Sequence, residues 1–250
     1  MLRVEHLSKS FGGVAATSDV SMEFPAGSLT AIIGPNGAGK TTFFNLISGA
    51  IRPDAGRILL EGEDVAGLPV ADIVARGVGR AFQVAQLFPT LTVEQSLRAA
   101  LMARQRHSAN MLRRFPMAQT RERAHEVMEL LGLQRKARTT SGNLSHGDQK
   151  LLDIALALVL EPKVLLLDEP VAGMGPEERT QMIDTVHRLW QRGGLTLVFI
   201  EHDMDIVFRI AQTVYVLSYG KLLAHGTPDE VRVNPLVIEA YLGAPAEEQP

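Results

Sequence analysis

GPNGAGKT, residues Gly34–Thr41, is the stretch that decides the fold of this 250-residue chain. It fits the pattern G-x-x-x-x-G-K-[ST], in which glycines permit a tight loop whose backbone N–H groups converge on phosphate oxygens. The Lys40 ammonium adds a positive charge for the β- and γ-phosphates, and the hydroxyl of Thr41 can bind Mg²⁺. The stretch does not fit G-x-G-x-x-G, which disfavours a dinucleotide fold. It predicts a nucleoside triphosphate site.

The flanks of this loop predict a strand before it and a helix after it. Leu29–Ile33 is mostly apolar and partly β-branched, as a buried strand should be, and Phe43–Ile47 has helical character up to Gly49. The N–H groups and the dipole of the helix N-terminus favour the same phosphate anion. The order strand, loop, helix indicates an α/β nucleotide-binding core.

The rest of the chain alternates between strand-like and helix-like stretches. The further predicted strands are Leu2–His6, Val20–Phe24, Arg57–Leu60, Val164–Leu167 and Leu195–Ile200. From about Leu91 to Leu160, apolar residues fall at helical spacing, which predicts a mainly helical subdomain at about 91–160. Strands that alternate with helices pair in parallel through crossover connections. We expect a single P-loop domain over 1–243 with an N-terminal β-rich part, followed by a flexible tail over 244–250.

Composition excludes several classes of protein. Apolar residues make up 46% of the chain and charged residues 21%, unlike a disordered sequence. The absence of cysteine excludes disulfides, thiolate zinc sites, iron–sulfur clusters and cysteine nucleophiles. No apolar run approaches the roughly 18 residues of a membrane-spanning helix, and the first residues do not resemble a signal peptide. These features predict a soluble intracellular protein.

Charge is unevenly distributed along the chain. The segment Arg98–Arg138 holds nine arginines and one lysine against three glutamates, whereas the whole chain has a formal net charge of −3. Such a basic segment fits an acidic partner, an anionic lipid surface or nucleic acid, or a solvated helical face whose arginines lie apart. The pattern alone does not distinguish these readings.

A second phosphate-site element follows the predicted strand Val164–Leu167. Asp168 and Glu169 come at its end, where ligands bind in open α/β sheets. The carboxylate of Asp168 suits Mg²⁺, directly or through water. Because successive strand residues point to opposite sides, Glu169 can face elsewhere and act as the general base that orients an attacking water.

Further motifs occur in a fixed order: Gln83 in Arg80–Gln83, then LSHGDQ at Leu144–Gln149, then His202 after an apolar strand. Together with the loop and the Asp168-Glu169 pair, this series resembles the ATP-binding subunit of ATP-binding cassette (ABC) transporters. The resemblance extends from about Leu2 to Gly243. It implies the ABC-type nucleotide-binding fold, ATP hydrolysis, and ATP with Mg²⁺ as substrate and metal.

The resemblance also implies a role for each motif residue. Gln83 would contact Mg²⁺ and the attacking water, His202 would hold the γ-phosphate, and Glu169 would complete the catalytic set. The Mg²⁺ ligands would be Thr41, Gln83 and Asp168. ATP would be bound by Phe11, which would stack on adenine, and by Gly34, Pro35, Asn36, Gly37, Ala38, Gly39, Lys40, Thr41 and Thr42. Ser145, Gly147 and Gln149 would complete the ATP site of a second cassette.

Three residues depart from the family's usual motifs. The usual Leu-Ser-Gly-Gly-Gln is replaced by a stretch with His146 and Asp148. Either Asp148 is an added residue and Gln149 keeps its role, or Asp148 takes the place of the usual Gln. Gly175 stands where the family often has an aspartate, so a route of communication between two ATP sites lacks its carboxylate.

Other stretches look like one branch of the family. Ala81–Val93, Glu201–Phe208 and Asn234–Gly243 resemble the branched-chain amino acid importers, whereas Leu144–Gly147 and Pro170–Met174 are similar to urea and short-amide importers of the same branch. The resemblance implies a second ATPase subunit, identical or not, two membrane-spanning permease subunits and a periplasmic solute-binding protein. It also implies a peripheral place at the cytoplasmic face of the inner membrane. The alternative is a non-transport ABC ATPase acting on nucleic acid, disfavoured by the lack of long coiled coils and zinc-binding cysteines.

We expect Lys40→Ala to weaken ATP binding, because it removes the positive charge that faces the β- and γ-phosphates. Equilibrium titration of the purified chain with a fluorescent ATP analogue measures the effect. An unchanged affinity would contradict the assignment of the phosphate site.

Overall fold

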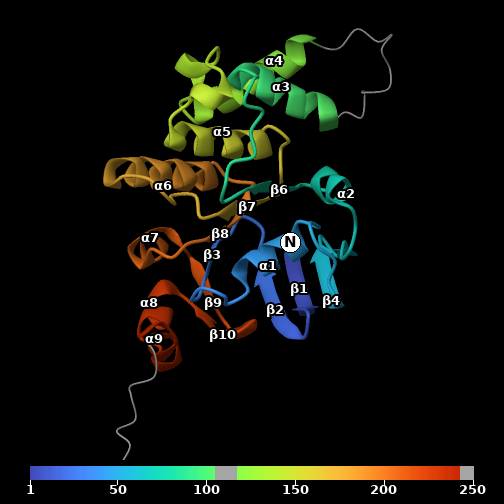
Figure 1. The fold of residues 1–250 in the computed structure, drawn as a ribbon, viewed down its shortest axis with the longest axis vertical. Coiled ribbons are helices and arrows are strands. Elements are labelled where there is room, and N and C mark those ends of the chain that lie inside the picture. The colour runs from blue at the N-terminus through green and yellow to red at the C-terminus, as the bar shows by residue number, and fades with distance from the viewer. Residues whose placement is uncertain (105–116, 243–250) are drawn as a thin grey trace, which may run out of the picture. The chain divides into compact units, whose positions relative to one another are not determined.

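The computed structural model describes residues 1–104 and 117–242, and the chain folds as two compact units (Figure 1). One unit joins Met1–Ile73 to Gly194–Pro250, and the other is Val74–Gly193. The predicted tail over 244–250 lies outside the described residues. The predicted single domain over 1–243, with its helical subdomain, stays a prediction.

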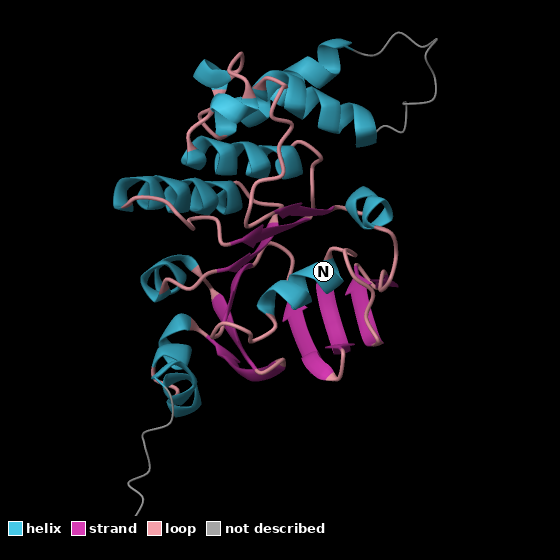
Figure 2. Ribbon diagram, in the orientation of Figure 1, coloured by secondary structure: helices cyan, strands magenta, loops and turns pink. Residues whose placement is uncertain are grey.

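The described residues form strands and helices in alternation over most of the chain (Figure 2). The strands are β1 (Leu2–Phe11), β2 (Val14–Phe24), β3 (Leu29–Ile33), β4 (Ala55–Leu60), β5 (Glu63–Asp64), β6 (Val78–Ala81), β7 (Val164–Asp168), β8 (Thr196–Ile200), β9 (Thr213–Ser218) and β10 (Lys221–Gly226). The α-helices are α1 (Lys40–Ile47), α2 (Val70–Ala75), α3 (Val93–Arg104), α4 (Met117–Leu130), α5 (His146–Leu158), α6 (Pro176–Gln191), α7 (Met204–Ile210), α8 (Pro228–Arg232) and α9 (Pro235–Leu242).

The first unit contains two kinds of sheet. β2, β1, β4 and β5 form an antiparallel sheet in that order, which is the predicted β-rich part. In the other sheet the order is β10-β9-β3-β8, and β3 runs parallel to both of its neighbours. All five residues of β3 are buried, and its bounds are those predicted from the apolar run. A central parallel strand buried on both faces reads as continuous apolar sequence, which is why it could be predicted.

The structure differs from the prediction mainly in the length of the first hairpin. β1 and β2 extend to Phe11 and from Val14, and they are joined at Gly12 and Gly13, both with positive φ. The register of the β1–β2 ladder shifts at three places, so the alternation of apolar and polar residues is interrupted. The β9–β10 hairpin was not predicted either, since β10 is only partly buried and its hydrophobic pattern is weak.

The second unit pairs two parallel strands with helices. β6 and β7 run side by side, with Val78 opposite Val164 and Ala81 opposite Leu167. Within the predicted helical stretch from Leu91 to Leu160, the described residues form α3, α4 and α5 and two short 3₁₀ turns. None of the helices within the described ranges is both long and apolar enough to cross a membrane.

The turn from β3 into α1 depends on two glycines that backbone groups approach closely. Gly34 has φ 150°, and a Cβ there would lie 2.1 Å from the carbonyl oxygen of Leu217. Gly39 has φ 97°, and a Cβ there would lie 2.2 Å from the carbonyl oxygen of Ala16. Gly37 also has a positive φ, but a Cβ would meet open space. Only a residue without a side chain fits the first two positions.

We expect Gly34→Ala to lower the stability of the chain by about 1–3 kcal/mol more than Gly37→Ala does, because only the first substitution forces a carbonyl away. The matched control carries the conformational cost of a positive φ without the collision. Thermal unfolding of both variants measures the difference. Equal midpoints would show that the loop relaxes without cost.

Candidate active site

The phosphate-binding loop of the first unit is held in shape by its own lysine. The Nζ of Lys40 is buried and donates to the carbonyl oxygens of Gly34, at 2.6 Å, and of Pro35, at 3.0 Å. Thr41, in the first turn of α1, is exposed, and Thr42 is half-buried. Asn36 and Gly37 at the tip are also exposed. The loop therefore presents backbone groups at a helix N-terminus, an arrangement that favours anions.

The register of β3 and β8 brings His202 to the sheet edge that carries this loop. Ile32 of β3 pairs in parallel with Ile200 of β8, so both strands end at the same edge. His202 follows two residues after Ile200, is exposed, and its backbone N–H donates to a carboxylate oxygen of Glu201 at 3.2 Å. An exposed imidazole at this edge suits contact with a phosphate.

Two aromatic residues of the first unit have contrasting surroundings. Phe11 is half exposed at the end of β1, and the Nζ of Lys9 lies 5.6 Å from its ring centroid. Tyr241 of α9 was not predicted as a site residue. Burial raises the pKa of Tyr241 to about 12, against the opposing effect of a hydrogen bond with the Gly34 backbone. That bond links the C-terminal helix to the phosphate-binding loop.

In the second unit, Asp168 is paired with a buried arginine on the neighbouring strand. Arg80 donates from Nη2 to Oδ2 of Asp168 at 2.9 Å, and both side chains are almost fully buried. The other oxygen, Oδ1, is buried and has no hydrogen-bond partner among the described residues. A buried carboxylate oxygen without a partner fits a Mg²⁺ ligand. Arg80 was missed in the sequence, where an arginine in a short strand carries no motif signal.

Gln83 and Glu169, predicted separately, contact each other. The Nε2 of Gln83 donates to Oε2 of Glu169 at 2.7 Å. The register of β6 and β7 explains this contact, because Ala81 pairs with Leu167 and each candidate follows its strand residue by two positions. Glu169 has φ 48°, a left-handed conformation that turns the chain at the end of β7. A carboxylate held by an amide donor can orient a water and accept its proton.

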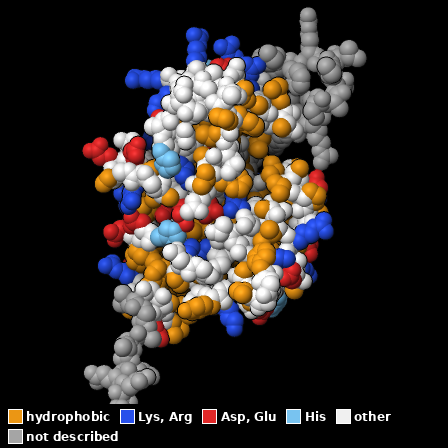
Figure 3. Space-filling view, viewed as in Figure 1, with side chains coloured by type: hydrophobic (Ala, Val, Ile, Leu, Met, Phe, Trp, Pro, Cys, Tyr) orange, Lys and Arg blue, Asp and Glu red, His pale blue; other side chains and the backbone are white. Residues whose placement is uncertain are grey.

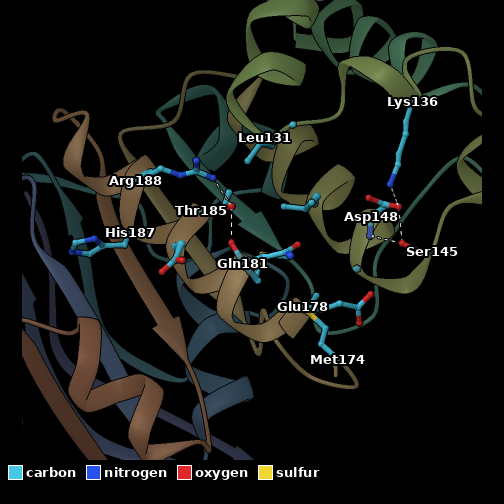
Figure 4. Close-up of a pocket in the computed structure, with 15 residues that line it drawn as sticks. Leu131, Lys136, Ser145, Asp148, Met174, Glu178, Gln181, Thr185, His187 and Arg188 are labelled. Carbon is cyan, nitrogen blue, oxygen red and sulfur yellow. Dashed lines mark hydrogen bonds and ion pairs between the residues drawn. The ribbon is translucent and has the colours of Figure 1, made fainter. Parts of the chain in front are cut away.

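The stretch Leu144–Gln149, which we call the signature stretch, leads into the first turn of α5 (Figure 4). Ser145 is the N-cap: its Oγ accepts from the backbone N–H of Asp148 at 3.2 Å and donates to Oδ2 of Asp148 at 2.6 Å. Lys136 forms an ion pair with the same carboxylate. The carboxylate of Asp148, which departs from the usual motif, thus holds the Ser145 hydroxyl in a hydrogen bond. The Nε2 of Gln149 donates to the Leu144 carbonyl at 3.3 Å.

Ser145 and Gly147 open on a pocket of about 860 Å³ that α6 also lines (Figure 4). A Cβ on Gly147 would lie 3.4 Å from a carboxylate oxygen of Glu178, so Gly147 lies close against α6. Gly175, at the N-cap of α6, donates from its backbone N–H to Glu178 at 3.3 Å. Glu178, in the first turn of α6, therefore lies beside both Gly147 and the N-cap of its own helix.

Lys150 and Asp153, on the buried face of α5, were not predicted as site residues. The Nζ of Lys150 donates to the carbonyl oxygens of Phe82 and Gln83 and, at 3.3 Å, of Glu169. Asp153 accepts from the backbone N–H of Phe82 at 2.6 Å. The available signal was two charges three positions apart, followed by an apolar run in the second half of the helix.

Several arginines of the basic segment form ion pairs with nearby glutamates, which partly neutralise their charge. The Glu94 carboxylate pairs with both Arg98 and Arg121, and Arg123 pairs with Glu126 and Glu161. Basic side chains gather at the end of the second unit that carries α3 and α4 (Figure 3). Residues 105–116 of the segment lie outside the described residues. The ion pairs favour a solvated helical face.

Comparisons with known proteins agree with these motifs. Residues 17–172 match the family model described as "ABC transporter", and residues 221–247 match "Branched-chain amino acid ATP-binding cassette transporter". The high-affinity branched-chain amino acid transport ATP-binding protein LivG of Escherichia coli (strain K12) is 38% identical, over 97% of this chain and 98% of its own length. BraF of Pseudomonas aeruginosa, with the same description, is also 38% identical over 97% and 98%.

Solved structures are similar as well. An ATP-binding cassette of an ABC transporter in its ADP conformation superposes with a TM-score of 0.84 at 32% identity, covering 97% of this chain and 98% of that one. A nucleotide-free cassette gives 0.83 at 32% identity, covering 97% and 99%. The predicted fold class is therefore confirmed.

Asp153 predicts how stability depends on pH. Burial raises its pKa from 3.8 to about 6, against opposing hydrogen bonds from Phe82 and Gln86 and the charges of Lys150 and Arg80. A carboxyl that binds its proton more tightly in the folded state than in the unfolded state contributes most stability below pH 3.8. That contribution falls as the pH rises to about 6 and then stays constant.

We expect the wild type to lose about 1.4 kcal/mol of unfolding free energy relative to Asp153→Asn between pH 5 and 7.5. Denaturant unfolding of both proteins across this range measures the difference, because Asn does not titrate. A difference that is independent of pH would mean that Asp153 has an ordinary pKa.

Proposed function

We propose an ATP-hydrolysis cycle for this chain, which belongs to the ATP-binding subunits of ABC transporters, in the branched-chain amino acid transport family. The chain is an ABC transporter ATPase, as its sequence predicts. The contact that most directly supports the assigned catalytic residues is the 2.7 Å hydrogen bond from Gln83 to Glu169. It joins a proton acceptor to an amide that can hold the same water.

ATP binds first through the phosphate-binding loop. The Lys40 ammonium leaves the loop carbonyls that it now contacts and turns to the β- and γ-phosphates, while N–H groups at the start of α1 bind phosphate oxygens. His202 binds the γ-phosphate, and the half-exposed ring of Phe11 stacks on the adenine. These contacts fix ATP before any bond breaks.

Asp168 and Thr41, with Gln83, are the residues that would hold Mg²⁺. Oδ1 of Asp168, which has no hydrogen-bond partner in the described part of the chain, and the hydroxyl of the exposed Thr41 are oxygen ligands of the type that Mg²⁺ prefers. Bound there, Mg²⁺ would neutralise negative charge on the phosphates. Among the described residues, no group of three or more His, Asp or Glu side chains could hold a metal ion.

Hydrolysis uses the Gln83–Glu169 pair. The Gln83 side chain orients a water, the water oxygen attacks the γ-phosphorus, and its proton passes to the carboxylate of Glu169. The bond between the γ-phosphorus and the bridging oxygen breaks, leaving ADP and inorganic phosphate. Glu169 then returns the proton to solvent.

A second ATPase subunit completes the site. Ser145 caps the N-terminus of α5, a 13-residue helix, where the hydroxyl and the backbone N–H groups can meet the γ-phosphate of ATP bound by the other subunit. The hydroxyl first leaves the Asp148 carboxylate to which it now donates. Gly147 has no side chain that would obstruct this phosphate, and the side chain of Gln149 adds an amide to the group that faces it. Binding of ATP closes the pair of subunits, and hydrolysis reopens it.

Two membrane-spanning permease subunits receive this motion. Phe82, Val84 and Phe88, around Gln83, are exposed apolar side chains, with 73% of Val84 accessible. Apolar side chains gathered on a surface are typical of a docking site. They would bring the permease against the Gln83 segment, so that the nucleotide state and the membrane subunits influence each other.

The solute is a branched-chain amino acid, delivered by a periplasmic binding protein, and this subunit lies peripherally at the cytoplasmic face of the membrane. The C-terminal family match and the descriptions of LivG and BraF favour this solute over urea and short amides. The Arg–Glu pairs on α3 and α4 weaken the nucleic-acid alternative.

We expect Glu169→Gln to bind ATP normally and to lower turnover by roughly 10²–10⁴, the range for loss of a positioned base. Steady-state phosphate release gives the turnover, and equilibrium titration gives the affinity. Lys40→Ala is the matched control, since it should lose binding as well. Near-normal turnover of Glu169→Gln would show that Glu169 is not the base.

A further inference from the structure

Helix α5 carries two buried charges on a face that is otherwise apolar. Lys150 and Asp153 are only 3% and 4% exposed, and they lie one turn apart between buried residues such as Leu152 and Ile154. A buried charge is costly unless polar partners surround it. We call Lys150 and Asp153 the α5 clamp. The groups that they contact therefore indicate what the two charges do.

Asp153 fastens both ends of the segment that contains Gln83. Its Oδ2 accepts from the backbone N–H of Phe82 at 2.6 Å, and its Oδ1 accepts from the backbone N–H of Gln86 at 3.3 Å. Gln83 lies between these two residues and is exposed. An exposed side chain thus stands on a backbone that is anchored on either side to a buried carboxylate.

Lys150 links the same segment to the residue that follows β7. Its ammonium donates to the carbonyl oxygens of Phe82, at 3.2 Å, and of Gln83, and at 3.3 Å to that of Glu169. Glu169 is held at φ 48°, a conformation that costs a non-glycine residue free energy and persists only where neighbours enforce it. A hydrogen bond from a buried ammonium to the Glu169 carbonyl provides such enforcement.

We propose that Lys150 and Asp153 are positioning residues for ATP hydrolysis, which hold the backbones of Gln83 and Glu169 so that these two side chains meet. The inference rests on the proposed roles of Gln83 and Glu169. Neither clamp residue touches the reacting atoms. The clamp also ties the backbones at both candidates to α5, whose N-cap is Ser145. The signature stretch and the two clamp residues are therefore carried by one helix.

The test compares Lys150→Met, which keeps the length of the side chain and removes its donors, with Lys150→Arg and Leu152→Ala in the full-length chain. We expect Lys150→Met to lower kcat about 100-fold, because small displacements of reacting groups have effects of that size. ATP affinity should stay within twofold, since the phosphate-binding loop is unchanged. Lys150→Arg, which keeps donors and charge, should recover at least tenfold of the lost kcat.

Leu152→Ala is the control for packing, since Leu152 is fully buried on α5 between the clamp residues. It should lower the melting temperature but keep kcat within threefold. A kcat for folded Lys150→Met within tenfold of wild type would overturn the proposal. So would a parallel loss of kcat in Leu152→Ala, or a matching loss of ATP affinity in Lys150→Met.

Adding Lys150→Met to Glu169→Gln separates this inference from the proposed function. If Lys150 acts through Glu169, the residual turnover of Glu169→Gln does not fall further in the double variant. A further large fall would overturn the positioning role. Normal turnover of Glu169→Gln alone would instead overturn the proposed function. If Lys150→Met does not fold, Asp153→Asn takes its place with the same readouts and the same limits.

Discussion

Buried parallel strands restrict polar chemistry to their carboxyl ends, and each unit of this chain is built around that constraint. All residues of β3 and of β7 are buried. A charged side chain in the middle of such a strand would lose its hydration unless a partner compensated for it. The phosphate-binding loop therefore follows β3, and the Asp168-Glu169 pair stands where β7 ends. In each unit, candidate site residues therefore follow a buried strand directly.

Much of this arrangement could be predicted because its signals are local. The glycines and Lys40 stand at fixed spacing, and the apolar runs of β3, β7 and β8 need no long-range information. The extent of the β1–β2 hairpin could not be predicted, since register shifts interrupt its alternation. The β9–β10 hairpin depends on pairing with β3, which only the folded sheet supplies.

For the site, residue types were predictable but contacts were not. Gln83 and Glu169 are 86 positions apart, and they meet only because β6 and β7 pair in one register. The charges on α5 carry no motif, so Lys150 and Asp153 acquire a role only through the backbone groups around them. Asp148 shows the converse: the sequence marks it as unusual, and the structure shows its carboxylate bound to Ser145 and Lys136.

In the proposed function, hydrolysis at Glu169 drives amino acid uptake through membrane partners. The most direct measurement is uptake of radiolabelled leucine by cells that lack this chain and carry either the wild type or Glu169→Gln in its place. We expect the wild type to restore uptake and Glu169→Gln, present in equal amount, to fail to restore it. Equal uptake with both proteins, or uptake that does not depend on the chain, would contradict it.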